Sequence, residues 1–398
     1  MEKEESIETL FSQTKDLARE NGVPTELVYG EGVVEGEGAA RLARLGHCAL
    51  LVTGAGAAAQ CGALDAVVAA LERNGQTHAH YAGVPPNPTV ACLYAAADVG
   101  RAAGADFVVG IGGGSPLDAA KLVALLLALP PARVPAPDAF FAAAPSLLAE
   151  PETRVLPLAA VPTTAGTGSE VTQYAIVTND AATTKTSVAH ARLFYALALL
   201  DPRHLATVPA ATVLHTALDS LCHSIESALS VRATPASDAA AHAGLRALAA
   251  CWPALEAHPG ALDTAVRARL LLASTLGGVA IARTGTVAVH ALGYSLTYFC
   301  GIPHGRANAL VLASYLRLVH ARCPAALAPV LAALRVPDVP ALAAMLDRVL
   351  GPRETLTRAN IDTFAPLAAA TRNIANSRVP PSLDDIRHMY ADSFGVSL

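Results

Sequence analysis

Four residues in the second half of the chain have the types and the spacing of ligands for a divalent metal ion. Asp219 and His223 stand four positions apart in LHTALDSLCHSIES, so on a helix their side chains project from one face. His290 in AVHALGYSL and His304 in GIPHGRANAL supply two more imidazoles. One carboxylate and three imidazoles suit a divalent transition metal, and such an ion polarises a carbonyl group as a Lewis acid. We therefore expect two segments to fold together around one metal ion.

The chain has 13 histidines, so chance spacing is a genuine alternative. A histidine that is hydrogen-bonded inside a helical core, next to a helix-face carboxylate, would explain the first pair equally well. The arrangement favours the metal, because the D-x-x-x-H pair, the H-A-L-G segment and the P-H-G turn all fall in the same half. His215, four residues before Asp219, is interpreted as a helix-face residue.

A glycine-rich turn in the first half has the composition of a phosphate-binding loop. Gly112, Gly113 and Gly114 follow an apolar run, and Ser115 and Asp118 open a helical run. A glycine backbone can approach a pyrophosphate closely, and a helix N-terminus favours its charge. The glycines run together instead of following the G-x-G-x-x-G spacing, so this turn alone is equally compatible with a structural role.

A second loop of small and hydroxyl-bearing residues strengthens the nucleotide interpretation. It reads VPTTAGTGSE, and its candidate contacts are Thr163, Thr164, Thr167 and Ser169. Asn87, an amide held between prolines in VPPNPT, adds a third loop. Three such loops in one half of the chain favour a dinucleotide.

Alternating strands and helices are expected to position these loops. Short β-rich runs lie at 49–52, 78–81, 106–110 and 196–200, and helical runs lie at 63–73, 89–103 and 116–129. This alternation predicts a parallel sheet covered on both faces, with a proline-punctuated loop at 130–151. Beyond residue 202 the chain reads as alanine- and leucine-rich helices at 212–230, 234–250, 263–282 and 305–320. The sequence thus predicts an α/β dinucleotide-binding domain over 1–202 and an all-α metal-binding domain over 203–398.

Composition argues against several classes of protein. The net charge of −5 and the lack of a basic block argue against nucleic acid as a partner. The best uninterrupted apolar run, 122–129, is shorter than the roughly 18 residues that cross a bilayer. The start, MEKEESIETLF, lacks the basic and apolar segments of a secretory signal. Seven scattered cysteines without a C-x-x-C pair fit a reduced cytoplasm, so we expect a cytoplasmic enzyme without a membrane partner.

Taken together, these motifs resemble the iron-containing (group III) alcohol dehydrogenase family, which shares its fold with dehydroquinate synthase and glycerol dehydrogenase. Residues 110–121 resemble the family's pyrophosphate loop, and 162–172 resemble its P-T-T-x-G-T-G-S-E-x-T segment. The 14-residue step from His290 to His304 is also the family's own. The likeness extends from about residue 27 to residue 320.

The resemblance implies a function and a set of site residues. Asp219, His223, His290 and His304 take the four metal positions, and Asn87 and Lys185 fall near the cofactor NAD(P)(H). Hydride would pass between the nicotinamide and a small aldehyde or alcohol, in a cleft between the two domains. The resemblance also implies a homodimer or a higher oligomer.

Two departures from the family pattern concern proton transfer and cofactor choice. Tyr294 replaces a histidine that the family commonly has near the nicotinamide. Because a tyrosine pKa near 10 is unsuited to shuttling protons at neutral pH, we expect Tyr294 to position the substrate. Gly54 stands where many NAD-preferring relatives have an aspartate that would repel a 2′-phosphate. The chain can therefore accept NADP, and we lean slightly to NADP over NAD.

A third departure concerns the substrate. ARTGTVAVHALGYSLT resembles the branch that reduces phosphonoacetaldehyde or sulfoacetaldehyde. Arg283 and Arg306 bring positive charge near the predicted metal, and a guanidinium suits a tetrahedral anion. Two solvated surface arginines are an equal alternative.

Rival functions are disfavoured by particular residues. A metal-independent maleylacetate reductase resembles the same fold, but here all four ligand positions are retained. A non-redox enzyme like dehydroquinate synthase needs several basic side chains in its pocket, and we find none at matched positions. A catalytically silent binding protein is disfavoured because no ligand position is lost.

Overall fold

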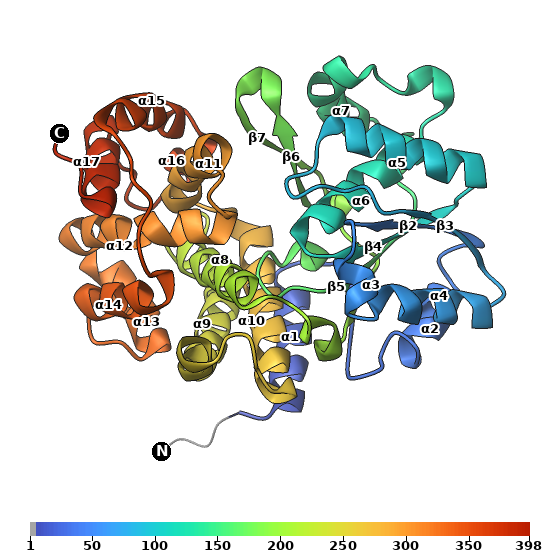
Figure 1. Ribbon diagram of the computed structural model, residues 1–398, viewed down its shortest axis with the longest axis horizontal. Coiled ribbons are helices and arrows are strands. Elements are labelled where there is room, and N and C mark those ends of the chain that lie inside the picture. Colours follow the sequence, from blue (N-terminus) through green and yellow to red (C-terminus); the bar gives the residue numbers. More distant parts are fainter. Residues whose placement is uncertain (1–4) are drawn as a thin grey trace. The chain divides into compact units, whose positions relative to one another are not determined.

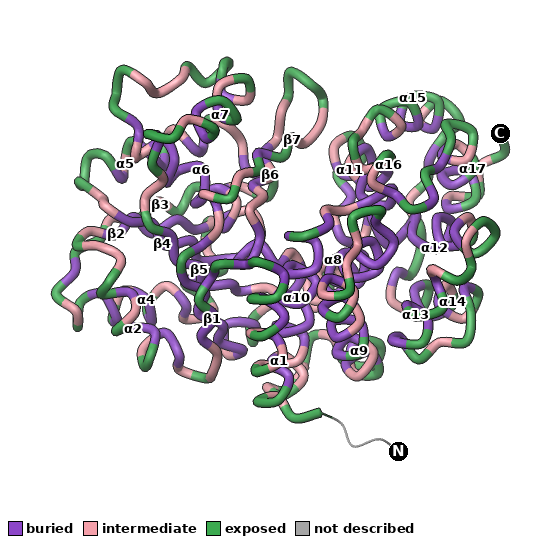
Figure 2. Tube along the Cα trace, turned by 180° about the vertical axis from the view of Figure 1, so that it is seen from behind, coloured by how far each residue is buried: buried purple, intermediate pink, exposed green. Residues whose placement is uncertain are grey.

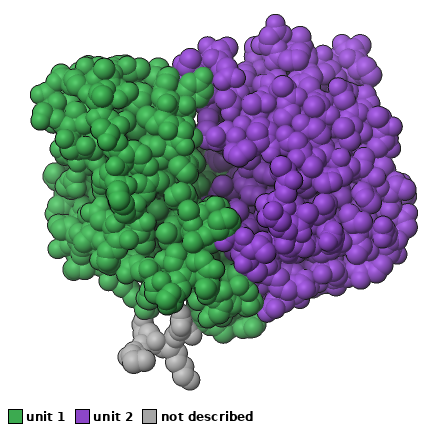
Figure 3. Space-filling model, in the orientation of Figure 1, with its two compact units in different colours: residues 1–22, 209–398 green, residues 23–208 purple. Residues whose placement is uncertain are grey.

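The computed structural model describes residues 5–398, and they form two compact units that are coloured separately in Figure 3. One unit is Val23–Val208, and the other joins the described residues up to Gly22 to Pro209–Leu398. The structure therefore differs from the expected division at residue 202, because helix α1 (Ile7–Glu20) belongs to the helical unit. Its buried residues Leu10 and Leu17 give it an apolar stripe, and α1 packs against α9 and α10. The amphipathic pattern of a helix that precedes the first strand does not reveal which of the two hydrophobic cores the helix packs against.

The α/β unit is built on a six-stranded sheet of order β1-β8-β5-β4-β2-β3, in which every pairing is parallel. Its strands are β1 (Glu26–Tyr29), β2 (Cys48–Thr53), β3 (Thr77–Tyr81), β4 (Phe107–Gly112), β5 (Leu158–Pro162) and β8 (Leu197–Leu200). Its helices are α2 (Glu37–Leu42), α3 (Ala57–Gln60), α4 (Ala63–Arg73), α5 (Val90–Ala103), α6 (Gly114–Ala128) and α7 (Phe140–Ala149). In Figures 1 and 2, α5 and α6 lie on one face of the sheet, and α2 and α4 lie on the other. This confirms the predicted parallel α/β architecture.

The central strands explain where the predicted phosphate loops lie. All six residues of β4, FVVGIG, are buried, as expected for a strand covered on both faces. The neighbouring strand β5 pairs with it in a register that places Gly112 opposite Pro162. Since the strands are parallel, the glycine turn after β4 and the VPTTAGTG loop after β5 leave the sheet side by side.

Several segments of the α/β unit were not anticipated, including strands β1 and β5. The predicted loop at 130–151 contains α7, where Phe140 and Leu148 are buried and Pro145 sits inside the helix. One proline there removes a single backbone N–H, and the apolar burial offsets that loss. An antiparallel hairpin, β6 (Tyr174–Asn179) with β7 (Thr184–Ala189), was also not anticipated.

The helical unit contains α1 and ten further helices among the described residues. These are α8 (Ala210–Ala228), α9 (Pro235–Ala257), α10 (Thr264–Thr284), α11 (Ala288–Cys300), α12 (His304–Arg322), α13 (Pro324–Leu334), α14 (Val339–Leu350), α15 (Arg358–Ala369), α16 (Arg372–Ala375) and α17 (Leu383–Phe394). By length and composition α10 could cross a membrane, but 78% of its most apolar window is buried inside the protein. A core helix meets the same criterion. The all-α character expected of this half is confirmed, and all seven cysteines are free thiols.

Candidate metal centre and cofactor loops

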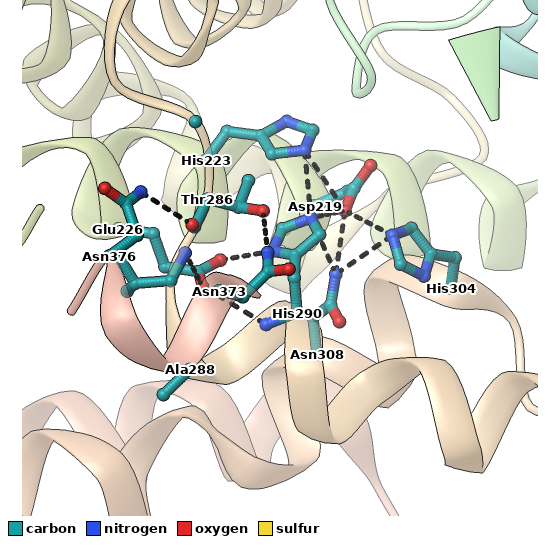
Figure 4. A network of polar contacts seen from close by, with 12 residues as sticks. Asp219, His223, Glu226, Thr286, Ala288, His290, His304, Asn308, Asn373 and Asn376 are labelled. Atoms are coloured by element: carbon teal, nitrogen blue, oxygen red, sulfur yellow. Dashed lines mark hydrogen bonds and ion pairs between the residues drawn. The ribbon is translucent and has the colours of Figure 1, made fainter. Parts of the chain in front are cut away.

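Three helices of the helical unit bring the four predicted metal ligands together (Figure 4). Helix α8 carries Asp219 and His223, α11 carries His290, and α12 begins at His304. The Asp219 Oδ1 lies 3.8 Å from the Nε2 atoms of His223 and His290, and 3.9 Å from the Nε2 of His304. The Nε2 atoms of His223 and His290 are 3.1 Å apart. One carboxylate oxygen and three imidazole nitrogens therefore converge.

The donor set fits a divalent transition metal. Asp219, His290 and His304 offer ligand atoms that all lie within 4.8 Å of one another, and His223 joins them through its contacts with Asp219 and His290. Asp219, His223 and His290 are buried, whereas the side chain of His304 is 27% exposed. A buried carboxylate among imidazoles is costly without a compensating cation or hydrogen bonds. Three nitrogens and one oxygen match the preferences of Fe(II) and Zn(II).

Glu226, one turn after His223 on α8, was not among the predicted site residues. It is fully buried, and its carboxylate contacts the Nδ1 of His290. It also accepts the backbone N–H groups of Val287 at 2.9 Å and His290 at 3.1 Å. A carboxylate at Nδ1 holds the proton there and leaves the Nε2 lone pair facing the other ligands. The sequence does carry a signal, since Glu226 lies seven residues after Asp219 on the same helix face.

Replacing Glu226 by glutamine is expected to lower the affinity for a divalent metal about 10- to 100-fold, the usual cost of losing such a support. The amide keeps the size of the side chain but loses the charge that orients His290. Chelator competition on the purified variant measures this effect. Glu20→Gln, on the exposed face of α1, is the control and should bind as the unchanged protein does. Equal affinity in Glu226→Gln would contradict the role.

Two glycines allow the three ligand-bearing helices to approach so closely. A Cβ on Gly305 would overlap the backbone carbonyl of His215 on α8, and a Cβ on Gly293 would overlap the side chain of Asn308 on α12. The H-A-L-G and P-H-G segments are thus packing requirements as well as ligand sites. His215 contributes its backbone to this packing, and none of the ligand contacts described above involves its ring.

Tyr294 lies beside two of the predicted ligands. Its ring stacks on that of His304, with centroids 5.6 Å apart and planes 8° apart, and it meets His290 edge-on at 6.2 Å. The side chain is half-buried. Tyr294 therefore lies next to two predicted ligands, and its expected role in positioning a substrate stays a prediction.

Tyr294→Phe is expected to raise KM for the aldehyde about 3- to 10-fold, the value of one hydrogen bond. The ring keeps its packing on His304, so metal content should not change. Steady-state kinetics on metal-loaded protein measure the effect, with metal content determined on the same sample. Unchanged KM and unchanged turnover would remove Tyr294 from the substrate site.

The two arginines proposed for an anionic substrate lie in different surroundings. Arg306 forms an ion pair with Glu354, at 2.7 Å and 3.0 Å, and also donates to the carbonyls of Leu350 and Pro352. Burial raises the pKa of Glu354, but the bonds from Arg306 outweigh burial and lower it overall. The charge of Arg306 is thereby neutralised, which speaks against it as a substrate anchor. Arg283 is exposed at the end of α10.

The glycine turn of the α/β unit packs against the second predicted loop. The Thr163 N–H donates to the Gly112 carbonyl at 2.9 Å. A Cβ on Gly113 would lie 3.0 Å from the Thr164 hydroxyl oxygen, and one on Gly114 would lie 2.6 Å from the Thr167 methyl carbon. Gly112 also has φ +150°, which a side chain rarely adopts. Glycine is therefore required here for contact between the loops, and its bare backbone is compatible with the predicted phosphate contact.

Asp118 and Ser169, both predicted near the cofactor, bond to each other. The Ser169 hydroxyl donates to Asp118 at 2.6 Å, and the Ile176 N–H donates to the other carboxylate oxygen at 2.9 Å. Lys121, which was not predicted, is fully buried and donates to Ser169 and to Thr172. Burial raises the pKa of Asp118 and lowers that of Lys121 to about 8, because it penalises both charged forms. Asp118 is thus committed to holding the loop, with both oxygens turned inward.

Other predicted cofactor residues lie around the glycine turn. The Asn87 N–H donates to the Ser115 hydroxyl at 3.1 Å, and Asn87 adopts φ 63°. Gly54 follows β2, and a Cβ there would lie 3.3 Å from the Val84 carbonyl. Lys185 lies on β7 opposite Thr178, in the hairpin. The structure brings Asn87 and Ser115 together, and the positive charge of Lys185 acts on the carboxylate of Asp118, on the helix that follows the glycines.

Comparison with known proteins gives a consistent result. The model of the iron-containing alcohol dehydrogenase family matches residues 24–202, and the C-terminal model of the Fe-containing alcohol dehydrogenase family matches residues 213–394. The chain is 33% identical over 293 residues to long-chain-alcohol dehydrogenase 1 of Geobacillus thermodenitrificans, covering 73% of this chain and 71% of that protein.

Solved structures show the same likeness. An iron-containing alcohol dehydrogenase from Thermotoga maritima superposes with a TM-score of 0.83 at 30% identity, covering 94% of this chain and 99% of that one. Sulfoacetaldehyde reductase from Bifidobacterium kashiwanohense, solved in complex with NAD+, gives a TM-score of 0.79 at 26% identity, covering 93% and 96%. Both halves of the chain are thus accounted for by one family, as the motifs indicated. The chain belongs to the iron-containing alcohol dehydrogenase family.

Proposed function

We propose that this chain is a metal-dependent, NAD(P)-linked alcohol dehydrogenase that reduces a small aldehyde. The observation that carries the proposal is the convergence of four donor atoms, from Asp219, His223, His290 and His304, within a member of this family. Membership supports the reaction class, and the donor set supports a metal-dependent form of it. The contact of Glu226 with His290 adds a support that a purely structural histidine would not need.

Each of the site residues would have a distinct role. Asp219 and the three histidines would hold Fe(II) or Zn(II), which as a Lewis acid favours negative charge on the carbonyl oxygen during hydride transfer. Glu226 holds the proton on the Nδ1 of His290, so the lone pair on Nε2 would be available to the metal ion. Tyr294, stacked on His304, would place its hydroxyl toward the substrate.

For the cofactor we propose NAD(P)(H), with a slight preference for NADP. The turn at Gly112 to Gly114 begins helix α6, where backbone N–H groups and the helix dipole suit a pyrophosphate. Gly54 after β2 places no carboxylate where a 2′-phosphate would need room. The ratio of kcat/KM with NADPH to that with NADH tests the preference.

For the substrate we propose a short aldehyde, including anionic ones such as sulfoacetaldehyde or phosphonoacetaldehyde. The similarity to sulfoacetaldehyde reductase and the tyrosine at position 294 support the anionic class. Arg283 is the remaining candidate for binding the anionic group of the substrate, since Arg306 is paired with Glu354. We further propose a cytoplasmic homodimer or higher oligomer, which the family resemblance supports and light scattering would test.

The decisive experiment is an aldehyde panel on protein of known metal content. Neutral and anionic short aldehydes are each assayed with NADH and NADPH, before and after treatment with a chelator. We expect cofactor oxidation that is lost on chelation and restored by Fe(II) or Zn(II). Full activity without metal would favour a maleylacetate reductase-like enzyme, and an inert protein showing no thermal shift with either cofactor would favour a binding protein.

A further inference from the structure

Asn308, on α12 one turn after His304, points its side-chain amide into the middle of the ligand set (Figure 4). Its Nδ2 lies 3.1 Å from the Asp219 Oδ1, 3.2 Å from the His290 Nε2 and 3.3 Å from the His304 Nε2. The residue is fully buried. One nitrogen therefore lies within hydrogen-bonding distance of three of the four predicted ligand atoms.

The chemistry of these neighbours determines which end of the amide faces them. Glu226 occupies the Nδ1 side of His290, so the Nε2 of His290 presents a lone pair. The Asp219 carboxylate oxygen is also an acceptor. An amide oxygen turned toward them would place lone pairs together, whereas the NH₂ group can donate. An amide NH₂ has two hydrogens, so it donates to two of these three atoms at a time or shares one hydrogen between two of them.

The oxygen of the Asn308 amide makes no hydrogen bond in the described structure, so the polar contacts of this side chain are those of Nδ2. Among residues 5–398, the Asn308 Oδ1 has no hydrogen-bond partner, and it is buried. It lies against the bare backbone of Gly293, where a Cβ would overlap it. An unsatisfied buried carbonyl costs stability, and an apolar side chain of similar size would avoid that cost. The contacts of Nδ2 with Asp219, His290 and His304 offset the cost of this unsatisfied oxygen.

We propose that Asn308 is a positioning residue that holds Asp219, His290 and His304 converged, so that a divalent cation meets a ligand set already in place. The proposal rests on the metal-dependent function proposed above. Gly293 has a part in it, because the absence of a Cβ leaves room for the Asn308 carbonyl. Removing the Asn308 amide, or displacing it with a Cβ at position 293, should therefore lower the affinity for metal to a similar extent.

The test is a double-mutant cycle read out by metal binding alone, without substrate or cofactor. Apo protein is titrated with Co(II), whose visible absorption reports an occupied site, and a chelator competition gives Kd. We expect Asn308→Ala to weaken Co(II) binding about 10- to 100-fold, as losing a partner of the ligands does. Gly293→Ala should weaken it similarly, while the double variant should lose little beyond Asn308→Ala, because the overlap is gone.

Each result bears on the proposal. Co(II) affinity within twofold of the unchanged protein in Asn308→Ala, or losses that add in the double variant, would overturn it. Asn360→Asp, on α15 in the same unit, serves as the control and should leave Kd unchanged. If circular dichroism shows that Asn308→Ala does not fold, Gly293→Ala decides alone, since alanine favours a helix and would otherwise be harmless. Absence of Co(II) binding in the unchanged protein would overturn both this inference and the proposed function.

Discussion

Replacing Asp219 by asparagine is expected to lower kcat/KM for the aldehyde by at least about 10²- to 10³-fold, because several kcal/mol of electrostatic stabilisation leave with the metal. Asp219 is the one predicted ligand that carries a charge, and its Oδ1 contacts all three histidines within 3.9 Å. Asparagine keeps the shape and removes the charge. Metal content and kinetics measured on the same preparation give the result.

A matched control separates loss of the metal from loss of a surface charge. Asp392→Asn, on α17 of the same helical unit, changes a side chain that is 61% exposed and should leave both quantities unchanged. The thermal midpoint of Asp219→Asn should be compared in apo form, so that lost metal does not appear as lost folding. Normal metal content together with normal turnover in Asp219→Asn would contradict the assigned site.

Replacing Lys121 by methionine is expected to destabilise the α/β unit by about 3–5 kcal/mol, the usual cost of leaving a buried charge without its partner. Lys121 donates to Ser169 at 2.9 Å, to Thr172 at 3.3 Å and to the carbonyl of Tyr174 at 2.6 Å, and Asp118 lies 3.8 Å away. Methionine fills the space but satisfies none of these groups. Differential scanning calorimetry should show a midpoint lowered by roughly 6–20 °C for a unit of this size.

The same substitution should also weaken cofactor binding, because Lys121 connects helix α6 to the loop that contains Ser169. Lys15→Met is the matched control, since Lys15 is half-buried on α1 and its ammonium group lies over the ring of Phe11. That variant should change stability by less than about 1 kcal/mol. Equal midpoints for the two variants would show that the buried lysine does not hold the loop.

Local periodicity was enough to pair two of the predicted ligands, but it did not reveal the groups that contact them. Asp219 and His223 could be paired from the sequence because a four-residue step on a helix fixes their common face. Glu226 shares that face, yet its partner is His290 on another helix, and sequence spacing does not reveal that contact. Asn308 is the same case, because its role depends on three atoms contributed by α8, α11 and α12.

In the α/β unit, the sequence predicted strands β2, β3, β4 and β8 but not β1 or β5, although all five residues of β5 are buried. Strand β4 is buried throughout and was expected. Strand β7, with the sequence TKTSVA, is only partly buried and shows no clear alternation of apolar and polar residues. Helix α7 was missed because Pro145 and the prolines before it read as loop signals, although tertiary burial of Phe140 overrides them. Arg306 shows the same limit for function, since its pairing with Glu354 depends on chain segments 48 residues apart.

The membership of α1 in the helical unit has a consequence for how the protein is made. Residues 23–208 leave the ribosome as one continuous stretch and can fold while translation proceeds, as domains generally do. Helix α1 emerges before them, but its neighbours α9 and α10 are translated only afterwards. Its apolar stripe therefore has no helical partner until α9 and α10 have been made. The predicted ligands on α8, α11 and α12 likewise come together only after the α/β unit has been translated.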